Sequence, residues 1–189
     1  MLRPLRLSIT TVLLAAPLAF AQAPAAPAPA PAPQTKAAAT PLQATATVKN
    51  AKGKKVGTVT LTEAPNGVMV KGELSHLSPG PHAIHIHEVG KCEAPKFSSA
   101  GGHFNPGHKQ HGFMVAEGMH AGDLPNLDVP ANGKIRFEYF DPHATLSGEN
   151  TVFDADGSAV VVHAKADDYK SQPSGDAGDR VACGVLEKK

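Results

Sequence analysis

Two histidines, His85 and His87, stand one residue apart in a stretch where apolar and polar side chains alternate. Side chains at positions i and i+2 of a β-strand project from the same face, so both imidazoles point one way while Ile84 and Ile86 point the other way. Two neighbouring imidazoles on a rigid strand suit copper or zinc. The pair alone is equally compatible with two partly exposed histidines on a sheet surface.

Further imidazoles and a carboxylate follow, at spacings that differ from those of a zinc finger: His103, His111, His120 and Asp123. They are a plausible tetrahedral zinc set if the chain between them folds back on itself. A distant apolar run ends at His163. An all-nitrogen set suited to copper would consist of His85, His87, His103 and His163. The two sets need eight ligand bonds from seven side chains, so one imidazole, that of His103, must serve both metals.

The elements that must position these residues are strands, because apolar residues recur with a period of two. We expect strands near residues 43–49, 54–62, 67–75, 82–88, 134–140, 158–164 and 181–186, with one more short strand poorly signalled. Short strands with Gly and Pro turns are typical of an all-β sandwich or barrel. The segment 89–133 has little strand pattern, and a loop of that length is expected to be held by a metal or a disulfide.

The remaining histidines are weaker candidates for ligands. His82 faces away from His85 in the predicted strand, and we expect it to be a structural hydrogen bonder. His76, His108 and His143 lie beside turns and are expected to be solvated.

Charge and cysteine content exclude several classes of function. The chain carries 18 Lys+Arg against 17 Asp+Glu. Without Arg3 and Arg6, which lie in a segment that we expect to be removed, the balance is 16 against 17, a net charge of −1. A nucleic-acid binder needs a strongly basic face, so no nucleic-acid partner is expected. Two cysteines exclude a four-cysteine zinc site and a cysteine-dense scaffold.

The N-terminal residues predict export. Arg3 and Arg6 precede an apolar stretch over 7–20, which is shorter than the ~20 residues that comfortably span a bilayer. Ala19-Phe20-Ala21 matches a small-x-small cleavage pattern. We therefore expect a signal peptide over 1–21 and a mature protein in the periplasm or secreted, without membrane insertion.

A change in composition marks the start of the folded domain. Ala and Pro dominate residues 22–41, which favours an extended polyproline linker without a core. Glycines occur only from Gly53 onward. We expect one domain over 42–189.

Six segments, in this order, resemble the copper/zinc superoxide dismutase family in its secreted bacterial form: HIHEVGKCE at 85–93, SAGGHFNP at 99–106, HGF at 111–113, HAGDLPNL at 120–127, VVHAKADD at 161–168 and GDRVACGV at 178–185. The resemblance implies a Greek-key β-sandwich, a flattened eight-stranded barrel with long metal-binding and electrostatic loops. It also implies an antioxidant oxidoreductase that disproportionates superoxide to dioxygen and hydrogen peroxide, by redox cycling of copper beside a structural zinc. The resemblance also allows a homodimer, in which the partner is a second copy of this chain.

The resemblance also assigns individual residues. It implies a copper site of His85, His87, His103 and His163, and a zinc site of His103, His111, His120 and Asp123. His103 would bridge the metals and donate a proton in the reaction. Arg180 matches the arginine that docks superoxide beside copper, and Asp167 matches an aspartate that links His85 to His111. Cys92 and Cys183 match the intrasubunit disulfide of the family.

The chain departs from animal members of the family in two places. The run between His163 and Arg180 is shorter and carries few cations, and the run between Gly90 and His103 is longer. Lys91 and Lys96 lie instead in the segment before His103, as in bacterial members. An alternative function is an extracytoplasmic module that stores or buffers copper and zinc without turnover, and a zinc hydrolase is a third. Arg180 favours catalysis because storage needs no anion-docking arginine. Four protein ligands would leave zinc no open position for a water molecule.

Overall fold

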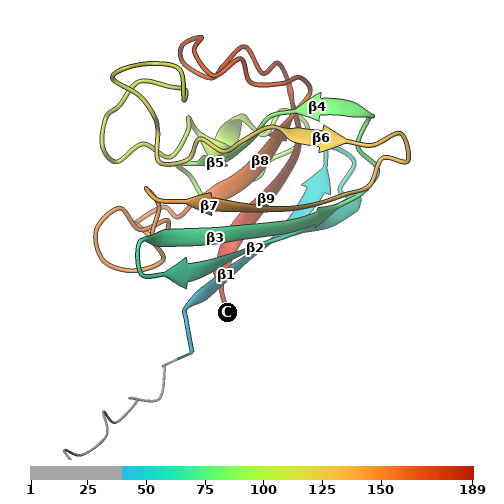
Figure 1. The fold of residues 1–189 in the computed structure, drawn as a ribbon. Coiled ribbons are helices and arrows are strands. Elements are labelled where there is room, and N and C mark those ends of the chain that lie inside the picture. Colours follow the sequence, from blue (N-terminus) through green and yellow to red (C-terminus); the bar gives the residue numbers. More distant parts are fainter. Residues whose placement is uncertain (1–39) are drawn as a thin grey trace, which may run out of the picture. The chain divides into compact units, whose positions relative to one another are not determined.

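The structure, a computed structural model, describes residues 40–189 (Figure 1). The predicted signal peptide over 1–21 and most of the predicted linker over 22–41 lie outside these residues. The described part contains nine strands: β1 (Gln43–Asn50), β2 (Lys55–Ala64), β3 (Gly67–Leu74), β4 (Gly80–His82), β5 (Ile84–His87), β6 (Leu127–Val129), β7 (Ile135–Asp141), β8 (Ala159–His163) and β9 (Arg180–Lys188). A short 3₁₀ helix, η1, covers Ser98–Ala100. No helix in this range is long and apolar enough to cross a bilayer.

Seven strands form one antiparallel sheet in the order β5-β8-β9-β1-β2-β3-β7, and β4 pairs with β6 in a two-stranded ribbon. Strands β1 and β9, β3 and β7, and β5 and β8 are neighbours in space although they lie far apart in the sequence. The ribbon connects the two edges of the curled sheet, because β6 packs beside β7 while β4 leads directly into β5 (Figure 1). The predicted all-β class is confirmed.

The strand predicted over 82–88 is wrong in one respect, since it forms two strands instead of one. Ala83 separates β4 from β5. Its N–H donates to the C=O of Lys165 at 2.7 Å, and its C=O accepts the N–H of His163 at 2.9 Å. These bonds fix the junction to the end of β8 instead of continuing a ladder. The poorly signalled strand is β6, so the described residues hold nine strands where eight were expected.

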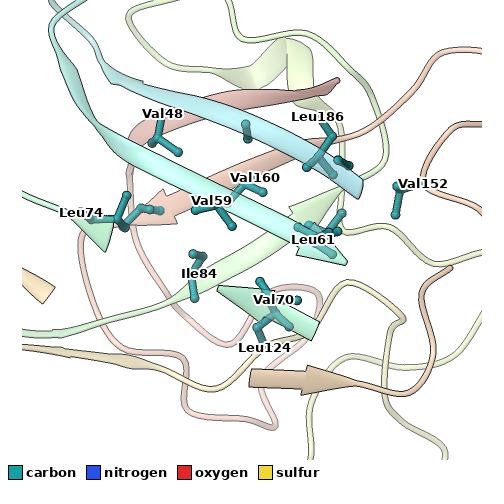
Figure 2. Close-up of a cluster of buried hydrophobic side chains, with 14 of the residues drawn as sticks. Val48, Val59, Leu61, Val70, Leu74, Ile84, Leu124, Val152, Val160 and Leu186 are labelled. Atoms are coloured by element: carbon teal, nitrogen blue, oxygen red, sulfur yellow. The ribbon is translucent and has the colours of Figure 1, made fainter. Parts of the chain in front are cut away.

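Alternate side chains of the strands fill the interior of the curled sheet. The core includes the residues labelled in Figure 2: Val48, Val59, Leu61, Val70, Leu74, Ile84, Leu124, Val152, Val160 and Leu186. Burial of each large apolar side chain contributes roughly 1.5–3 kcal/mol. Leu124 belongs to the segment 89–133, which is therefore anchored in the same core as the strands.

Strand β5 divides its side chains between this core and the opposite face. Ile84 and Ile86 pack in the core, whereas His85 and His87 lie on the outer face, as the alternation predicted. A second, smaller apolar cluster forms apart from the main core: Phe97, Ala100, Ala159, Val161 and Cys183. Through Phe97 and Ala100 it holds the segment 89–133 against β8 and β9.

Candidate metal centre

Strand β5 pairs with β8 along one edge, and the segment 89–133 pairs with its other edge. His87 pairs with His103, and His85 pairs with Asp123, as isolated antiparallel bridges. Between these bridges, both backbone groups of Ile86 are hydrogen-bonded to the same segment, at 2.8 and 2.9 Å. Ladder-like bonds thus bring two chemically active residues of a distant segment opposite the two strand histidines.

Four buried histidines converge beside this edge: His85, His87, His103 and His163. One ring nitrogen of each lies within 4.8 Å of the others. The Nε2 atoms of His87 and His163 are 3.4 Å apart. His163 reaches the group because it ends β8, the strand that pairs with β5. The structure therefore brings together the four residues predicted as copper ligands.

A second group adjoins the first and has a carboxylate at its centre: His103, His111, His120 and Asp123. The Oδ1 atom of Asp123 lies 2.8 Å from Nδ1 of His103 and 3.0 Å from Nδ1 of His111. Nδ1 of His120 is 3.4 Å from the same oxygen. Oδ2 of Asp123 accepts the backbone N–H groups of Gly112 and His120 at 2.9 and 3.0 Å. The carboxylate is thus fixed with one oxygen toward three imidazoles.

His103 belongs to both groups. Its Nδ1 faces Asp123, and its Nε2 is buried without a hydrogen-bond partner among residues 40–189. The centre of its ring is 3.9 Å from that of His85. An imidazole with one nitrogen in each group has the geometry that a ligand shared by two metals requires.

The buried donor atoms fit two metal ions. Three buried ring nitrogens have no hydrogen-bond partner among residues 40–189: Nδ1 of His85, Nε2 of His103 and Nδ1 of His120. A buried polar atom without a hydrogen-bond partner lowers the stability of the fold by about 1–3 kcal/mol. A cation bound to that atom would remove this loss. Four imidazoles suit copper, and three imidazoles with a carboxylate suit zinc.

Burial and nearby carboxylates set the protonation of the imidazoles. Burial lowers the pKa of His103 and of His163 to about 3. Burial acts in the same direction on His111, but hydrogen bonds with Asp123 and Asp167 outweigh it and raise its pKa to about 9. Neutral imidazole is the form that binds a metal. A cation can therefore enter the first group directly, whereas at the second group it must displace a proton from His111.

Asp167 connects the two groups by contacting one histidine of each. It contacts the Nε2 atoms of these histidines, and their Nδ1 atoms remain for a metal. Its Oδ2 lies 2.9 Å from Nε2 of His85, and its Oδ1 lies 3.0 Å from Nε2 of His111. Burial raises the pKa of Asp167, but hydrogen bonds from these two histidines hold it well below its usual range. A carboxylate that accepts one ring N–H fixes the tautomer, so the other nitrogen is left for the metal.

Two amide side chains hold the backbone of these residues, and the sequence analysis did not identify them. Nδ2 of Asn126 donates to the C=O of Asp167 at 2.9 Å, and its Oδ1 accepts the N–H of Asp167 at 2.8 Å. Gln172 makes the equivalent pair of bonds with His111, both at 2.9 Å. Contacts from an amide to a distant backbone have no spacing signature. Asn126 does lie in the segment HAGDLPNL that carries the family resemblance, whereas Gln172 lies in none of the six segments.

Gly175 was missed for a similar reason. Its φ is +71°, and a Cβ built there would overlap Oδ1 of Asp167 and lie 2.7 Å from Nε2 of His111. Only glycine leaves room for the bond between these two side chains.

Arg180, the first residue of β9, lines a cleft together with three histidines of the first group: His87, His103 and His163. Its Nη1 donates to the C=O of Phe97 at 2.7 Å, and its Nη2 donates to the C=O of Gly101 at 2.6 Å. Burial lowers its pKa, but a guanidinium stays protonated at any physiological pH. A small anion that enters the cleft therefore meets an oriented positive charge.

Cys92 and Cys183 form a disulfide, with Cα atoms 5.6 Å apart. Cys183 lies on β9, the strand that begins at Arg180. Cys92 lies in the segment that carries Phe97 and Gly101. The bridge ties the strand of the arginine to the segment whose carbonyls hold that arginine.

The other histidines lie as expected. Nδ1 of His82 is 2.6 Å from the C=O of His163, and its Nε2 is 2.9 Å from the C=O of Ser78, so its predicted structural role is confirmed. Three further histidines are exposed: His76, His108 and His143. Of these, His108 also lines the cleft of Arg180.

Comparisons with known proteins agree with this geometry. The family model for copper/zinc superoxide dismutase (SODC) matches residues 55–186. Superoxide dismutase [Cu-Zn] 1 of Aquifex aeolicus is 45% identical over 152 residues, which cover 79% of this chain and 90% of the relative. Superoxide dismutase [Cu-Zn] of Caulobacter vibrioides is 48% identical over 148 residues, which cover 76% of this chain and 85% of the relative.

Solved structures give the same result. A superoxide dismutase-like protein from Bacillus subtilis superposes with a TM-score of 0.73 at 40% identity, covering 76% of this chain and 97% of that one. The Cu/Zn superoxide dismutase from Brucella abortus superposes with a TM-score of 0.64 at 34% identity, covering 77% of this chain and 99% of that one.

Proposed function

The chain belongs to the copper/zinc superoxide dismutase family, and from that premise we propose which of its side chains hold each metal and carry the reaction. It is an oxidoreductase that acts on superoxide. Two superoxide ions and two protons give one dioxygen and one hydrogen peroxide. The alternative of metal storage without turnover is not favoured, because the relatives are named for the enzyme.

We assign copper to the four-histidine group and zinc to the group around Asp123. The single observation that carries this assignment is the position of His103, which places one ring nitrogen in each group. When bound, copper supplies the one-electron redox chemistry, and zinc, which has no redox chemistry, holds His103 in place. Asp167 supports both groups by accepting the outer N–H groups of His85 and His111.

Arg180 binds the substrate in this proposal. Superoxide is a small anion, and the guanidinium offers it several N–H donors in a fixed plane. Because the C=O groups of Phe97 and Gly101 hold the side chain from behind, the charge is oriented before the anion arrives. Binding therefore needs little rearrangement of the protein.

His103 delivers a proton. The reduction of superoxide to hydrogen peroxide consumes two protons, and His103 is one of the residues that line the cleft of Arg180, with its Nε2 buried behind the cleft surface. Burial lowers the pKa of this imidazole to about 3, so a proton on it is more acidic than one on the reduced oxygen anion. Nε2 would hold a proton only while it holds no metal; it would take that proton from solvent and pass it to the anion, and water would supply the second proton. Its Nδ1 stays on the side of Asp123, and the ring keeps its orientation during the transfer.

The protein acts outside the cytoplasm in this proposal, in the periplasm or secreted. Two features support it, the signal-peptide pattern over 1–21 and the disulfide, since disulfides persist in oxidising compartments. The Ala/Pro-rich residues 22–41 would then separate the folded domain from the cleavage point. N-terminal sequencing of exported protein should find Gln22 first.

Metal analysis of ligand variants, with a superoxide assay, tests the assignment. His163 contributes only to the first group and His120 only to the second. We expect His163→Ala to lose copper and turnover but keep zinc, and His120→Ala to lose zinc while it keeps copper. A catalytic zinc would require an open coordination position, so the assay is expected to follow copper and not zinc.

His143→Ala is the control, because His143 is exposed. It should keep both metals and the activity of the parent. If folded His163→Ala loses zinc and keeps copper, the two metals have been assigned the wrong way round. Parent protein that binds copper without turnover would favour storage.

A further inference from the structure

Glu88, which directly follows His87, holds both backbone groups of Gly102. Its N–H donates to the C=O of Gly102 at 3.0 Å, and its Oε1 accepts the N–H of Gly102 at 2.8 Å. Its side chain is exposed and lines the cleft of Arg180. We infer that Glu88 is a positioning residue for the reaction, acting through the peptide group between Gly101 and Gly102. The inference rests on the proposed function.

That peptide group joins three side chains. Its N–H faces the carboxylate of Glu88. Its C=O, which belongs to Gly101, accepts Nη2 of Arg180 at 2.6 Å and lies 3.1 Å from Nδ1 of His87. Because a peptide group is planar, its N–H and C=O cannot turn independently. A carboxylate that fixes the N–H therefore fixes the acceptor of both the anion-docking arginine and a proposed copper ligand.

The local backbone gives this contact its importance. Gly101 has a φ of +72°, and Gly102 follows it without a side chain, so two successive glycines leave this peptide group easy to rotate. A hydrogen bond to an ionised carboxylate is roughly twice as strong as one between neutral groups. Gly101 and Gly102 themselves do not restrict rotation of this peptide group. The hydrogen bond from the Gly102 N–H to the carboxylate of Glu88 can therefore fix its orientation.

The charge of Glu88 also acts along the peptide. A negative group at the N–H end polarises the amide and makes the C=O a stronger acceptor, because hydrogen bonds in a chain strengthen one another. A stronger acceptor at Nδ1 makes the His87 imidazole a better electron donor at its other nitrogen. By itself a carboxylate in a cleft that admits an anion repels the substrate. Its position is explained if it supports the groups that bind the anion.

Two substitutions separate the hydrogen bond from the charge. Glu88→Gln keeps an acceptor oxygen and loses the charge, whereas Glu88→Ala loses both. Glu93→Gln is the matched control, because Glu93 is exposed in the following segment and only its backbone groups are hydrogen-bonded among residues 40–189. It removes the same charge without touching the peptide between Gly101 and Gly102.

Three measurements follow the variants: the NMR shift and hydrogen exchange of the Gly102 amide in metal-free protein, the affinity of copper-loaded protein for azide, and the copper reduction potential. Glu88→Ala should shift the amide upfield, speed its exchange and weaken azide binding on the order of fivefold, the loss expected for one hydrogen bond. Glu88→Gln should restore azide binding. Both variants should raise the reduction potential, and Glu93→Gln should match the parent throughout.

Two results would overturn the inference: azide affinity in Glu88→Ala equal to that of the parent, or no rescue by Glu88→Gln. An unchanged potential in both Glu88 variants would overturn the polarisation of His87. The amide measurement needs no metal, so it tests the contact even if the proposed copper site fails. Failure of the copper site itself would appear in the parent, as absent copper or absent turnover.

Discussion

In the proposed function, Arg180 meets the substrate with a charge that two backbone carbonyls have already oriented. Among residues 40–189 its hydrogen bonds run to the backbone of Phe97 and Gly101, and none runs to a side chain of the two metal groups. A substitution of Arg180 therefore removes no proposed metal ligand, although the arginine shares the C=O of Gly101 with His87.

Arg180→Glu should reduce superoxide turnover strongly while copper stays bound. Reversal of the charge replaces attraction by repulsion at short range, inside a cleft where salt screens incompletely. We expect the loss in the second-order rate constant, measured by pulse radiolysis beside metal analysis. Raised ionic strength should slow the parent and affect the variant much less. Arg136→Glu, an exposed arginine on β7 paired with Glu73, is the control. Full copper with parental turnover in Arg180→Glu would remove the docking role.

At the scale of elements, the second metal group is built by two loops that hold each other. Segment 89–133 carries His111, and the loop after β8 carries Asp167, Gln172 and Gly175. Asp167 and Gln172 both bond to His111, one to its ring and the other to its backbone. The loop after β8 thus orients His111, a candidate zinc ligand that belongs to the segment 89–133.

Gly175→Ala should break this arrangement. The new Cβ would displace Asp167 from His111, and loss of such a supporting carboxylate typically costs about 10–100-fold in metal affinity. Gly148→Ala is the control, since Gly148 has a φ of +73° and no atom within 4 Å of a built Cβ. Both variants carry the backbone cost of a positive φ, about 1–2 kcal/mol. Competition with a chelator measures zinc affinity, and equal affinities in the two variants would argue against the close contact.

The sequence could predict elements and ligands where the signal is local. Alternation predicted the main strands, and the spacing of His85 and His87 predicted two imidazoles on one face. Local patterns could not predict the break at Ala83, because its backbone groups bond to residues some 80 positions away. The contacts of Gln172 and Asn126 could not be predicted for the same reason. Their function exists only when two distant loops meet.

For the whole molecule, net charge says little about how an anion reaches the site. The chain is nearly neutral, yet the lining of a groove that includes Arg180 also contains two lysines, Lys52 and Lys96, against one carboxylate, that of Asp179. The sequence had singled out Lys96, in the segment before His103. Lys52 comes from the turn between β1 and β2, and only the fold places it beside the cleft.

Lys96→Glu should slow superoxide association at low ionic strength, with little change in copper content. The difference from the parent should shrink as salt rises, because the screening length falls to about 8 Å at physiological ionic strength. Lys189→Glu is the control, as it makes the same change in charge beyond the far end of β9. Identical salt dependence in the two variants would mean that Lys96 does not guide the anion.

Removal of the disulfide should weaken both stability and turnover. It closes a loop with a sequence separation of 91, for which chain entropy gives about 4–5 kcal/mol. Denaturant unfolding of the Cys92→Ser/Cys183→Ser protein, with metals removed from it and from the parent, measures this term. Turnover should also fall because the carbonyls that hold Arg180 lie in the released segment. Stability within 1 kcal/mol of the parent would show that the core alone fixes that segment.

If His103 is shared by two metals as proposed, its imidazole makes the two metal-binding equilibria interdependent. A metal bound by the group around Asp123 would order the His103 ring and its segment, which would favour binding at the four-histidine group. Linkage then requires that the second ion strengthen the binding of the first by the same factor. Repulsion between the two cations across the ring sets a limit to this gain. The balance of these two effects would decide whether the proposed sites load together or one after the other.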